Sequence, residues 1–529
     1  MVKVNTKSIR MLALLAVLLI VVVLVSGCVK EPKKTSVHKK TPAEKPVIKG
    51  EPNDLENRQS TTSAFDYPFG INDAFASSQE KSSDYLKDLG VEWVSDHFAR
   101  REIEKSETGG DYDFSEIDGK LEEYVAQTNS NMWFIINIES KFKFKDGRGI
   151  KSGKSGKKFV PDGPQSYKAY GEFLKALVTY VNSRIPGEKV KLWSIDNEHS
   201  SLFVPAFCES DGNLDKECGE KAAKAYADLV EFSYTIIKDL DPEAKIVFGG
   251  PGGGTPDEEY EYYYKPALKA LKAKDQNGFF DFFDYHDFNL YRGYKENPRG
   301  KGLPFFRSML MEAGFPDKPI IMKSGATHSG MDILAKNKRL HTYQTERDQA
   351  EYLIKRFIYH AGEGVKLILW GSVREDLDEH DTYSYNGLVY NGIPKVGNCD
   401  PSKTLPCPDP GDGVKKLSYY SFKLLTEKLK GSDWDTIQTI YEKDGVYIYK
   451  FTKAGKPIWV AWNDNSAEKQ ITISSVNANQ AKITEAIPKY ESGKEVTDFN
   501  TAFETETKTV NEGKITITLK DKPLFVEEQ

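Results

Sequence analysis

Short apolar runs alternate with amphipathic segments over residues 66–431, and this alternation restricts the fold more than any other feature. Within each run the apolar residues are continuous and do not alternate with polar ones, as expected for strands covered on both faces of a sheet. Three intervening segments, 166–184, 221–240 and 346–362, space their apolar residues three and four positions apart and are predicted as helices. Strands are predicted at 68–72, 92–98, 132–140, 191–197, 245–250, 279–288, 320–324 and 366–372.

The order of these elements predicts the fold class. Eight strands that alternate with helices over about 365 residues indicate an α/β fold, a (β/α)8 TIM barrel at 65–431. A doubly wound open sheet is the alternative, but it would need a glycine-rich phosphate-binding turn after an early strand. The glycine run 249–254 contains Pro251 and lacks a lysine, so it is predicted as a flexible loop.

The last part of the chain follows a different pattern. From residue 432 the predicted strands become shorter, and apolar residues alternate with polar ones along them. The segment 446–462 has the form of a hairpin. A small antiparallel β-sandwich domain is therefore predicted at 432–529.

The N-terminus carries the features of a secretory signal. Three basic residues precede an apolar run at 11–25, which is followed by Ser26, Gly27 and Cys28. This ending resembles a lipobox and predicts a lipoprotein signal peptide at 1–28, with Cys28 as the lipidated residue. A transmembrane anchor is the alternative, but the run is shorter than the ~20 residues that a spanning helix needs.

The following segment, 29–64, is rich in Lys, Glu, Pro, Ser and Thr and contains almost no large apolar residues. Such a composition cannot bury enough surface to fold, so the segment is predicted as a disordered tether. The chain is expected at the cell surface, on the extracellular side of the membrane, held by a lipid anchor at Cys28.

The other four cysteines fall into two close pairs. Outside the cytoplasm such pairs oxidise, which predicts the disulfides Cys208–Cys218 and Cys399–Cys407. A metal site is the alternative, but no Cys-x-x-Cys spacing supports one. The acidic segment 375–381 also lacks the spaced pattern of a calcium loop. Neither a metal nor a cofactor is expected.

Composition excludes several classes of protein. Hydrophobic residues make up 39% and charged residues 29%, which is a globular balance and not that of a disordered, collagen-like or polytopic membrane chain. With 73 basic and 79 acidic residues the net charge is −6, so no nucleic-acid partner is expected. The 28 Tyr and 28 Phe suit sugar binding as well as a protein core.

The fourth predicted strand ends in an Asn-Glu pair. Functional residues of a TIM barrel lie at the C-terminal ends of its strands, and here Asn197 and Glu198 occupy that position. The pair resembles that of clan A glycoside hydrolases. The resemblance implies that Glu198 is the general acid/base and that Asn197 contacts the sugar 2-hydroxyl. Protonating a poor leaving group needs a carboxylic acid with a raised pKa on a rigid strand end.

Other stretches resemble the same clan over about residues 66–529. The sixth strand contains Asp284-Tyr285-His286, where a histidine often lines the clan's site. Trp370 ends strand eight, where the clan places a tryptophan under the sugar. Segment 387–395 is similar to the clan's segment that leads into the last helix, and segment 522–526 is similar to the closing strand of the clan's sandwich.

Two departures concern catalysis. The clan's retaining members carry a Glu nucleophile at the end of strand seven, where this chain has Lys323 and Ser324. The strand-two Arg that orients the nucleophile is replaced by Ser95, although Arg100 and Arg101 follow closely. Retention needs two carboxyls ~5–5.5 Å apart, and a serine is a poor substitute without an activating base, a role in which Lys323 is conceivable.

Other carboxylates are possible partners for Glu198. An inverting pair needs a gap of ~6.5–9.5 Å, which the sequence does not measure. The alternative is that these acids bind sugar hydroxyls or face solvent. The candidates are Glu139, Asp287, Glu375 and Asp376.

The sequence therefore predicts a glycoside-hydrolase-like surface lipoprotein that acts on or binds a polysaccharide or glycan. If it is active, Glu198 is the acid. The predicted substrate-binding residues are Asn197, His286, Trp370, Ser324 and Asp376, with His199 and His328 as weaker candidates. The alternative is a non-catalytic carbohydrate-binding or cell-surface interaction protein, and an anchored scaffold without a ligand is a third possibility.

Overall fold

The described part of the chain falls within one compact unit that spans Thr62–Gln529. The computed structural model describes residues 67–72, 82–105, 110–127, 132–142, 149–152, 158–185, 189–208, 214–288, 293–297, 299–330, 333–334, 339–340, 343–375, 385–394 and 410–529. The predicted signal peptide, the tether and Cys28 lie outside these ranges.

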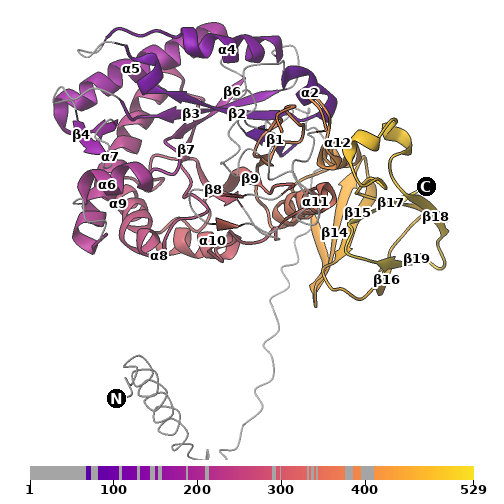
Figure 1. The fold of residues 1–529 in the computed structure, drawn as a ribbon. Helices are drawn as coiled ribbons and strands as arrows, with labels where there is room; N and C mark the ends of the chain where they lie inside the picture. The colour runs from indigo at the N-terminus through magenta and orange to yellow at the C-terminus, as the bar shows by residue number, and fades with distance from the viewer. Residues whose placement is uncertain are drawn as a thin grey trace, which may run out of the picture. The chain divides into compact units, whose positions relative to one another are not determined.

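Eight parallel strands close into a barrel, which confirms the predicted fold class (Figure 1). Hydrogen bonds join the strands in chain order, and β1 closes the ring by pairing with both β2 and β12. The strands are β1 (Phe69–Asn72), β2 (Trp93–Ala99), β3 (Trp133–Glu139), β6 (Val190–Ile195), β7 (Lys245–Phe248), β8 (Phe282–Phe288), β9 (Ile320–Ala326) and β12 (Ile368–Trp370).

Amphipathic helices surround the barrel. The three segments predicted as helices form α5 (Gly163–Arg184), α7 (Lys216–Leu240) and α11 (Glu346–Gly362), and each buries its apolar stripe. Thr345 and Asp348 close a capping box at the start of α11, which satisfies backbone N–H groups that the helix leaves unpaired. The others include α2 (Ser82–Leu89), α4 (Ser115–Gln127), α6 (Ser200–Phe207), α9 (Lys265–Lys274), α10 (Leu303–Glu312) and α12 (Leu417–Leu429).

The barrel interior is layered from apolar to polar. Side chains alternate along a strand, so residues two apart point to the same side. A floor of buried apolar residues fills one layer. Two positions further along five of these strands, β2, β3, β6, β8 and β9, the inward-facing residues become polar. The floor contains Trp93, Ile135, Leu192, Val247, Phe282, Ile321, Leu367 and Leu369, and the layer above it contains Ser95, Asn137, Ser194, Asp284 and Lys323.

The C-terminal region is a sandwich of antiparallel sheets, as predicted. A six-stranded sheet ordered β13-β14-β15-β20-β17-β18 shares an apolar core with the pair β16-β19. The predicted hairpin joins β14 (Val446–Lys453) to β15 (Lys456–Asn463), and both turn residues have positive φ angles, as a tight type I′ turn requires. The remaining strands are β13 (Gln438–Lys443), β16 (Lys469–Ser474), β17 (Gln480–Glu485), β18 (Thr505–Thr509), β19 (Lys514–Leu519) and β20 (Leu524–Glu528).

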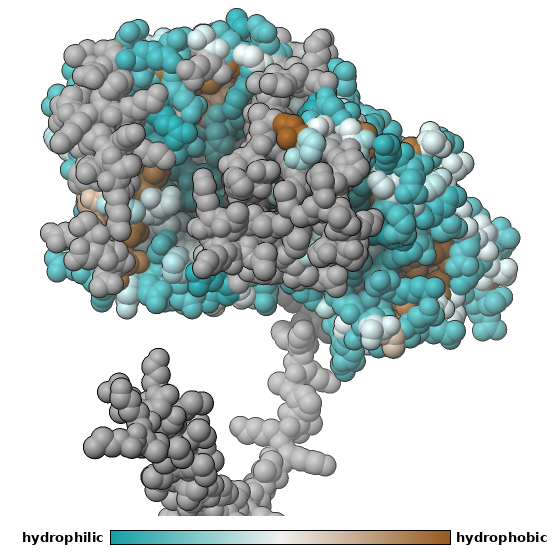
Figure 2. Space-filling model, in the orientation of Figure 1, coloured by the Kyte–Doolittle hydropathy of each residue, from teal (hydrophilic) through white to brown (hydrophobic). Residues whose placement is uncertain are grey.

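Polar contacts fix the sandwich to the barrel. The Trp462 indole N–H donates to the Tyr294 hydroxyl at 2.9 Å, and Lys355 of α11 pairs with Asp464 at 2.9 Å. Within the described ranges, no helix is long and apolar enough to cross a membrane. The face in Figure 2 is mostly hydrophilic where it is described.

Candidate functional site

The site begins at the polar layer of the barrel, where a buried lysine connects four strands. Lys323 of β9 is fully buried, and its Nζ donates to Asn137 Oδ1 of β3 at 2.6 Å and to Ser194 Oγ of β6 at 2.9 Å. It also pairs with Asp284 Oδ2 of β8 at 3.4 Å. These three acceptors hold the ammonium in place, so Lys323 serves as a fixed positive charge rather than as an available base.

Asp284 and His286 continue this network towards the end of β8. Being two residues apart, both side chains point inward. Asp284 is buried; Oδ1 accepts from the Lys323 backbone N–H at 2.8 Å, and Oδ2 lies 3.1 Å from His286 Nε2. Burial opposes its ionisation, but Lys323 and His286 outweigh this and keep the Asp284 pKa below its ordinary value.

His286 joins this buried pair to Glu198. Its Nδ1 lies 3.3 Å from Glu198 Oε1, so the ring bridges two carboxylates. Burial lowers the pKa of His286, but the charge of Asp284 and the hydrogen bonds to both carboxylates raise it to about 9. At neutral pH the imidazole of His286 is therefore positively charged, and both ring nitrogens carry a proton and act as donors.

Glu198 stands where β6 leads into α6, and its side chain is 40% exposed. The residue has a φ of 48°, and its N–H donates to the Gly250 carbonyl at 3.0 Å. Burial raises the pKa of Glu198, but the hydrogen bond from His286 and the positive charge nearby lower it overall. A general acid was expected to have a raised pKa, so the environment of Glu198 favours the opposite direction.

The glycine run after β7 forms the wall beside Glu198. A Cβ atom at Gly252 would lie 2.9 Å from the Glu198 carboxyl carbon, so a larger residue would displace the carboxylate. This close approach, rather than the flexibility predicted from the sequence, explains the glycine at that position.

A second carboxylate, Glu139, ends β3 and lies among three basic side chains. His97 lies 3.4 Å from it, Arg101 3.5 Å and Lys141 2.8 Å. Burial opposes the ionisation of Glu139, but these partners outweigh it and hold its pKa well below the ordinary value. Glu139 is therefore an ion-paired anion.

The remaining acids at the strand ends are also occupied. Asp196 is buried and accepts from the Ser140 N–H at 2.9 Å and from its hydroxyl at 2.5 Å, while burial raises its pKa to about 6. Glu375 is buried and pairs with Lys416 at 2.5 Å. Asp376 and the side chain of Asp287 lie outside the described residues.

The remaining residues that the sequence analysis named at the strand ends are buried or half-buried, and their roles stay predictions. Asn197 precedes Glu198, and its Oδ1 has no hydrogen-bond partner within the described ranges. Ser324 is buried and pairs in register with His286. Ser95 is buried and accepts from Asn137 Nδ2 at 2.7 Å. Trp370 is fully buried and donates to the Asn386 carbonyl at 2.9 Å, so its ring offers no exposed face to a sugar here.

The two weaker histidine candidates are core residues. His199 is buried, stacks on Tyr226 and contacts the Tyr263 hydroxyl at 2.7 Å and the Gly249 carbonyl at 2.9 Å. Its pKa is far below the ordinary value because burial disfavours the charged ring. His328 is also buried and contacts Gln344.

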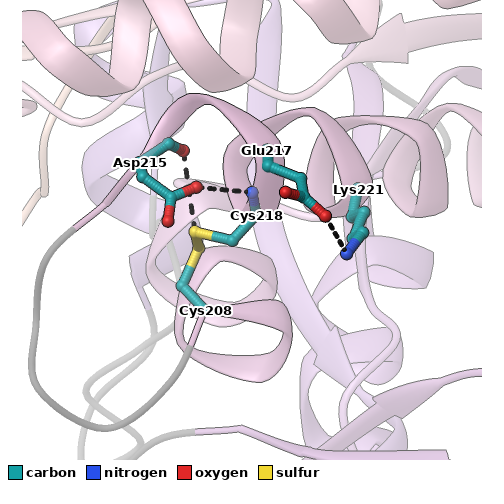
Figure 3. The surroundings of a disulfide bond; sticks show 5 residues. All are labelled: Cys208, Asp215, Glu217, Cys218 and Lys221. Atoms are coloured by element: carbon teal, nitrogen blue, oxygen red, sulfur yellow. Dashed lines mark hydrogen bonds and ion pairs between the residues drawn. A yellow bond between two sulfur atoms is a disulfide. The ribbon is translucent and has the colours of Figure 1, made fainter.

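A disulfide joins α6 to the start of α7, which confirms the predicted Cys208–Cys218 pair (Figure 3). The Asp215 carboxylate caps α7 by accepting from the Cys218 N–H at 2.8 Å. Cys399 and Cys407 lie outside the described residues. No group of three potential metal ligands occurs among the residues that the structure describes.

Solved structures with a similar fold are glycoside hydrolases. A family 30 endoxylanase from Clostridium papyrosolvens is 13% identical at a TM-score of 0.50, covering 87% of this chain and 96% of its own. A family 30 subfamily 8 xylanase from Clostridium acetobutylicum is 13% identical at a TM-score of 0.51, with the same coverage. A glucosidase from Croceicoccus marinus is 11% identical at a TM-score of 0.51, covering 87% and 95%.

These neighbours include clan A enzymes with an eight-stranded parallel barrel, so the predicted resemblance holds for the fold. No protein-family model matches the sequence, and no curated protein matches it either. At such identities the similarity establishes the architecture and not the activity.

Proposed function

We propose that this protein binds a polysaccharide in a glycosidase-type barrel without hydrolysing it, with Glu198 acting as a carboxylate that accepts hydrogen bonds from sugar hydroxyls. The observation that carries the proposal is the chain of contacts from Lys323 through Asp284 and His286 to Glu198. These contacts place a positively charged imidazole beside Glu198, the residue that a glycosidase would need as a proton donor. The positive charge favours the ionised carboxylate, which has no proton to give.

The electrostatics explain why this site differs from a retaining one. A retaining glycosidase has a second carboxylate about 5–5.5 Å from the acid, and like charge raises the pKa of the acid. Here Lys323 and Ser324 stand at the end of strand seven, and the charge near Glu198 is positive. Among the described residues, the other carboxylates at the mouth are either buried or ion-paired. The Asn197 amide oxygen, next to Glu198 in the chain, is buried and has no hydrogen-bond partner among the described residues.

Hydrolysis with Glu198 as the acid is the second candidate. It is favoured by the 40% exposure of Glu198 at the C-terminal end of the barrel, where this fold places its active sites.

In either case we propose a surface lipoprotein, anchored through Cys28 and held away from the membrane by the tether 29–64.

A polysaccharide panel tests the proposal. We expect the purified protein to bind at least one glycan while releasing no reducing ends. Glu198→Gln should weaken that binding about tenfold, because a hydrogen bond to a charged group contributes roughly 1.5–3 kcal/mol. Glu243→Gln, at an exposed site before β7, is the matched control and should bind normally.

Release of reducing ends by the wild type, abolished in Glu198→Gln, would instead establish hydrolysis. The absence of both binding and release over the whole panel would contradict a glycan-binding function.

A further inference from the structure

The turn 196–198, which joins β6 to α6 and carries Glu198, has an unfavourable backbone conformation. Asp196 has a φ of 51° and Glu198 a φ of 48°, on either side of Asn197. In this left-handed region the Cβ atom crowds the following carbonyl oxygen, and a residue other than glycine stays there only where its surroundings hold it. The contacts around this turn therefore decide where the Glu198 carboxylate lies.

One side of the turn packs against the loop that follows β7. The Glu198 N–H donates to the Gly250 carbonyl at 3.0 Å, and His199 Nε2 lies 2.9 Å from the Gly249 carbonyl. A Cβ atom at Gly249 would lie 1.9 Å from the Asp196 carbonyl oxygen, so the two backbones are in direct contact. This side of the turn is held by contacts with the backbone of the glycine run.

The other side of the turn is held by the Asp196 side chain. Its Oδ1 accepts from the Ser140 backbone N–H at 2.9 Å, and its Oδ2 accepts from the Ser140 hydroxyl at 2.5 Å. Both residues are fully buried. Two hydrogen bonds to one residue fix the direction of the carboxylate as well as its distance, so Asp196 clasps the turn to the end of β3.

The end of β3 is a firm attachment point. Ser140 follows Glu139, whose carboxylate pairs with Lys141 at 2.8 Å and with Arg101 at 3.5 Å. A functional side chain keeps its geometry when the residues behind it are themselves locked by hydrogen bonds and ion pairs. The clasp therefore connects Glu198 to a part of the barrel mouth that is already fixed.

The fold alone gives no reason for an acid at position 196. Burial raises the pKa of Asp196 to about 6. Ionising this carboxyl at neutral pH therefore makes the folded protein less stable than a neutral residue with the same hydrogen bonds would. Residues that lower stability in this way are expected at functional sites.

We propose that Asp196 is a positioning residue of the binding site, whose clasp on Ser140 fixes the turn 196–198 and keeps Glu198 against His286. The identity of the ligand rests on the proposed function, whereas the position of Glu198 is tested without a ligand. Without the clasp the turn relaxes from its left-handed conformation. Glu198 then moves away from the imidazole, and its hydrogen bonds to the glycan weaken.

Two substitutions of Asp196 separate its hydrogen bonds from its charge. Asp196→Gly removes the carboxylate, and because glycine tolerates a φ of 51°, the clasp is lost without added backbone strain. Asp196→Asn removes the same charge, but its amide accepts from the Ser140 N–H and donates to the Ser140 hydroxyl, and asparagine tolerates the left-handed region. The difference between the two variants therefore reports the clasp.

The matched control lies in the sandwich. Asp498 is exposed, and its carboxylate accepts from the Asn500 N–H at 3.0 Å. Asp498→Gly removes a hydrogen-bonded carboxylate and adds a glycine, as Asp196→Gly does, but leaves the barrel unchanged.

NMR titration of Glu198 and His286 measures the effect. In the wild type we expect the Glu198 midpoint below 4.5 and the His286 midpoint near 9. In Asp196→Gly the Glu198 midpoint should rise, and the His286 midpoint should fall by about one unit or more, because an adjacent opposite charge shifts a pKa by roughly one to three units. Asp196→Asn and Asp498→Gly should keep both midpoints close to those of the wild type.

Binding of dextran, xylan and polygalacturonate is the second measurement. For a polysaccharide that the wild type binds, Asp196→Gly should weaken the affinity about tenfold, as expected for Glu198→Gln, because the same hydrogen bonds to the charged carboxylate are lost. Asp196→Asn should bind like the wild type.

Unchanged midpoints in Asp196→Gly would overturn the inference. Equal shifts in the glycine and asparagine variants would also overturn it, since the charge of Asp196 and not its clasp would then be responsible. If Asp196→Gly does not fold, Ser140→Ala removes the hydroxyl bond alone; shifts in the same directions support the clasp, and wild-type midpoints contradict it. Shifted midpoints in a protein that binds no polysaccharide would refute the proposed function and leave the positioning role in place.

Discussion

Replacing Lys323 with methionine is expected to lower the free energy of unfolding by about 3–5 kcal/mol, since removal of one partner leaves a buried charge uncompensated. Asp284 would keep only His286 as a cationic partner, and Asn137 Oδ1 and Ser194 Oγ would lose their donor inside the barrel. Methionine fills a similar volume, so the loss reports charge and hydrogen bonding rather than a cavity. Urea unfolding of wild type and variant measures it.

Two further variants make this result specific. Lys323→Met combined with Asp284→Asn removes both charges and should recover part of the loss, as the two residues form one network. Lys514→Met, on the exposed surface of the sandwich, should change the stability by no more than about 0.5 kcal/mol. If Lys323→Met were as stable as Lys514→Met, the lysine would not be the buried cation described above.

The second large effect is a loss of stability at alkaline pH. The pKa of His286 rises from 6.5 to about 9 on folding. A group whose pKa is raised in the folded state adds its full stabilisation below the unfolded pKa and loses it as the pH rises through the folded pKa. Here the shift corresponds to roughly 3 kcal/mol, present below pH 6.5 and lost by about pH 10. Denaturant unfolding across this range measures it.

The matched variant is His286→Gln, which keeps a donor and removes the titrating ring. It should be less stable than the wild type near pH 6, and the difference should shrink as the pH rises from about 6.5 to about 9 and stay small above that. A constant difference between the two proteins from pH 6 to pH 10 would show that His286 does not carry the shifted proton. The imidazole resonance of His286, followed by NMR, should titrate near pH 9.

The architecture could be predicted from the sequence because it depends on periodic patterns. Apolar strands and one-sided helices repeat eight times, and this is enough to predict a barrel; the hairpin turn at Ala454 and Gly455 could be recognised locally. The antiparallel hairpin of β4 (Gly149–Ser152) and β5 (Lys158–Pro161) was missed because each strand has only four residues, and the sequence between them is rich in Lys and Gly, which are poor strand formers.

The site could be predicted only in part. The Asn-Glu pair at the end of β6 was identified from its position, and His286 from the resemblance. The spacing of Asp284 and His286 could have predicted that both side chains point into the barrel, since residues two apart on a strand share a face. The contact of Lys323 with β3 and β6 depends on three strands that lie far apart in the sequence. The burial of Trp370 depends equally on tertiary packing.

The ionisation of Glu198 is the property that distinguishes binding from hydrolysis most directly. Infrared or carbon-13 NMR titration of its carboxylate, with Glu198→Gln to assign the signal, measures its pKa. We predict a midpoint below the ordinary 4.5, with the group ionised throughout the neutral range. A midpoint near 6 to 7, as in glycosidases that use a glutamic acid as proton donor, would contradict the proposed role and favour hydrolysis.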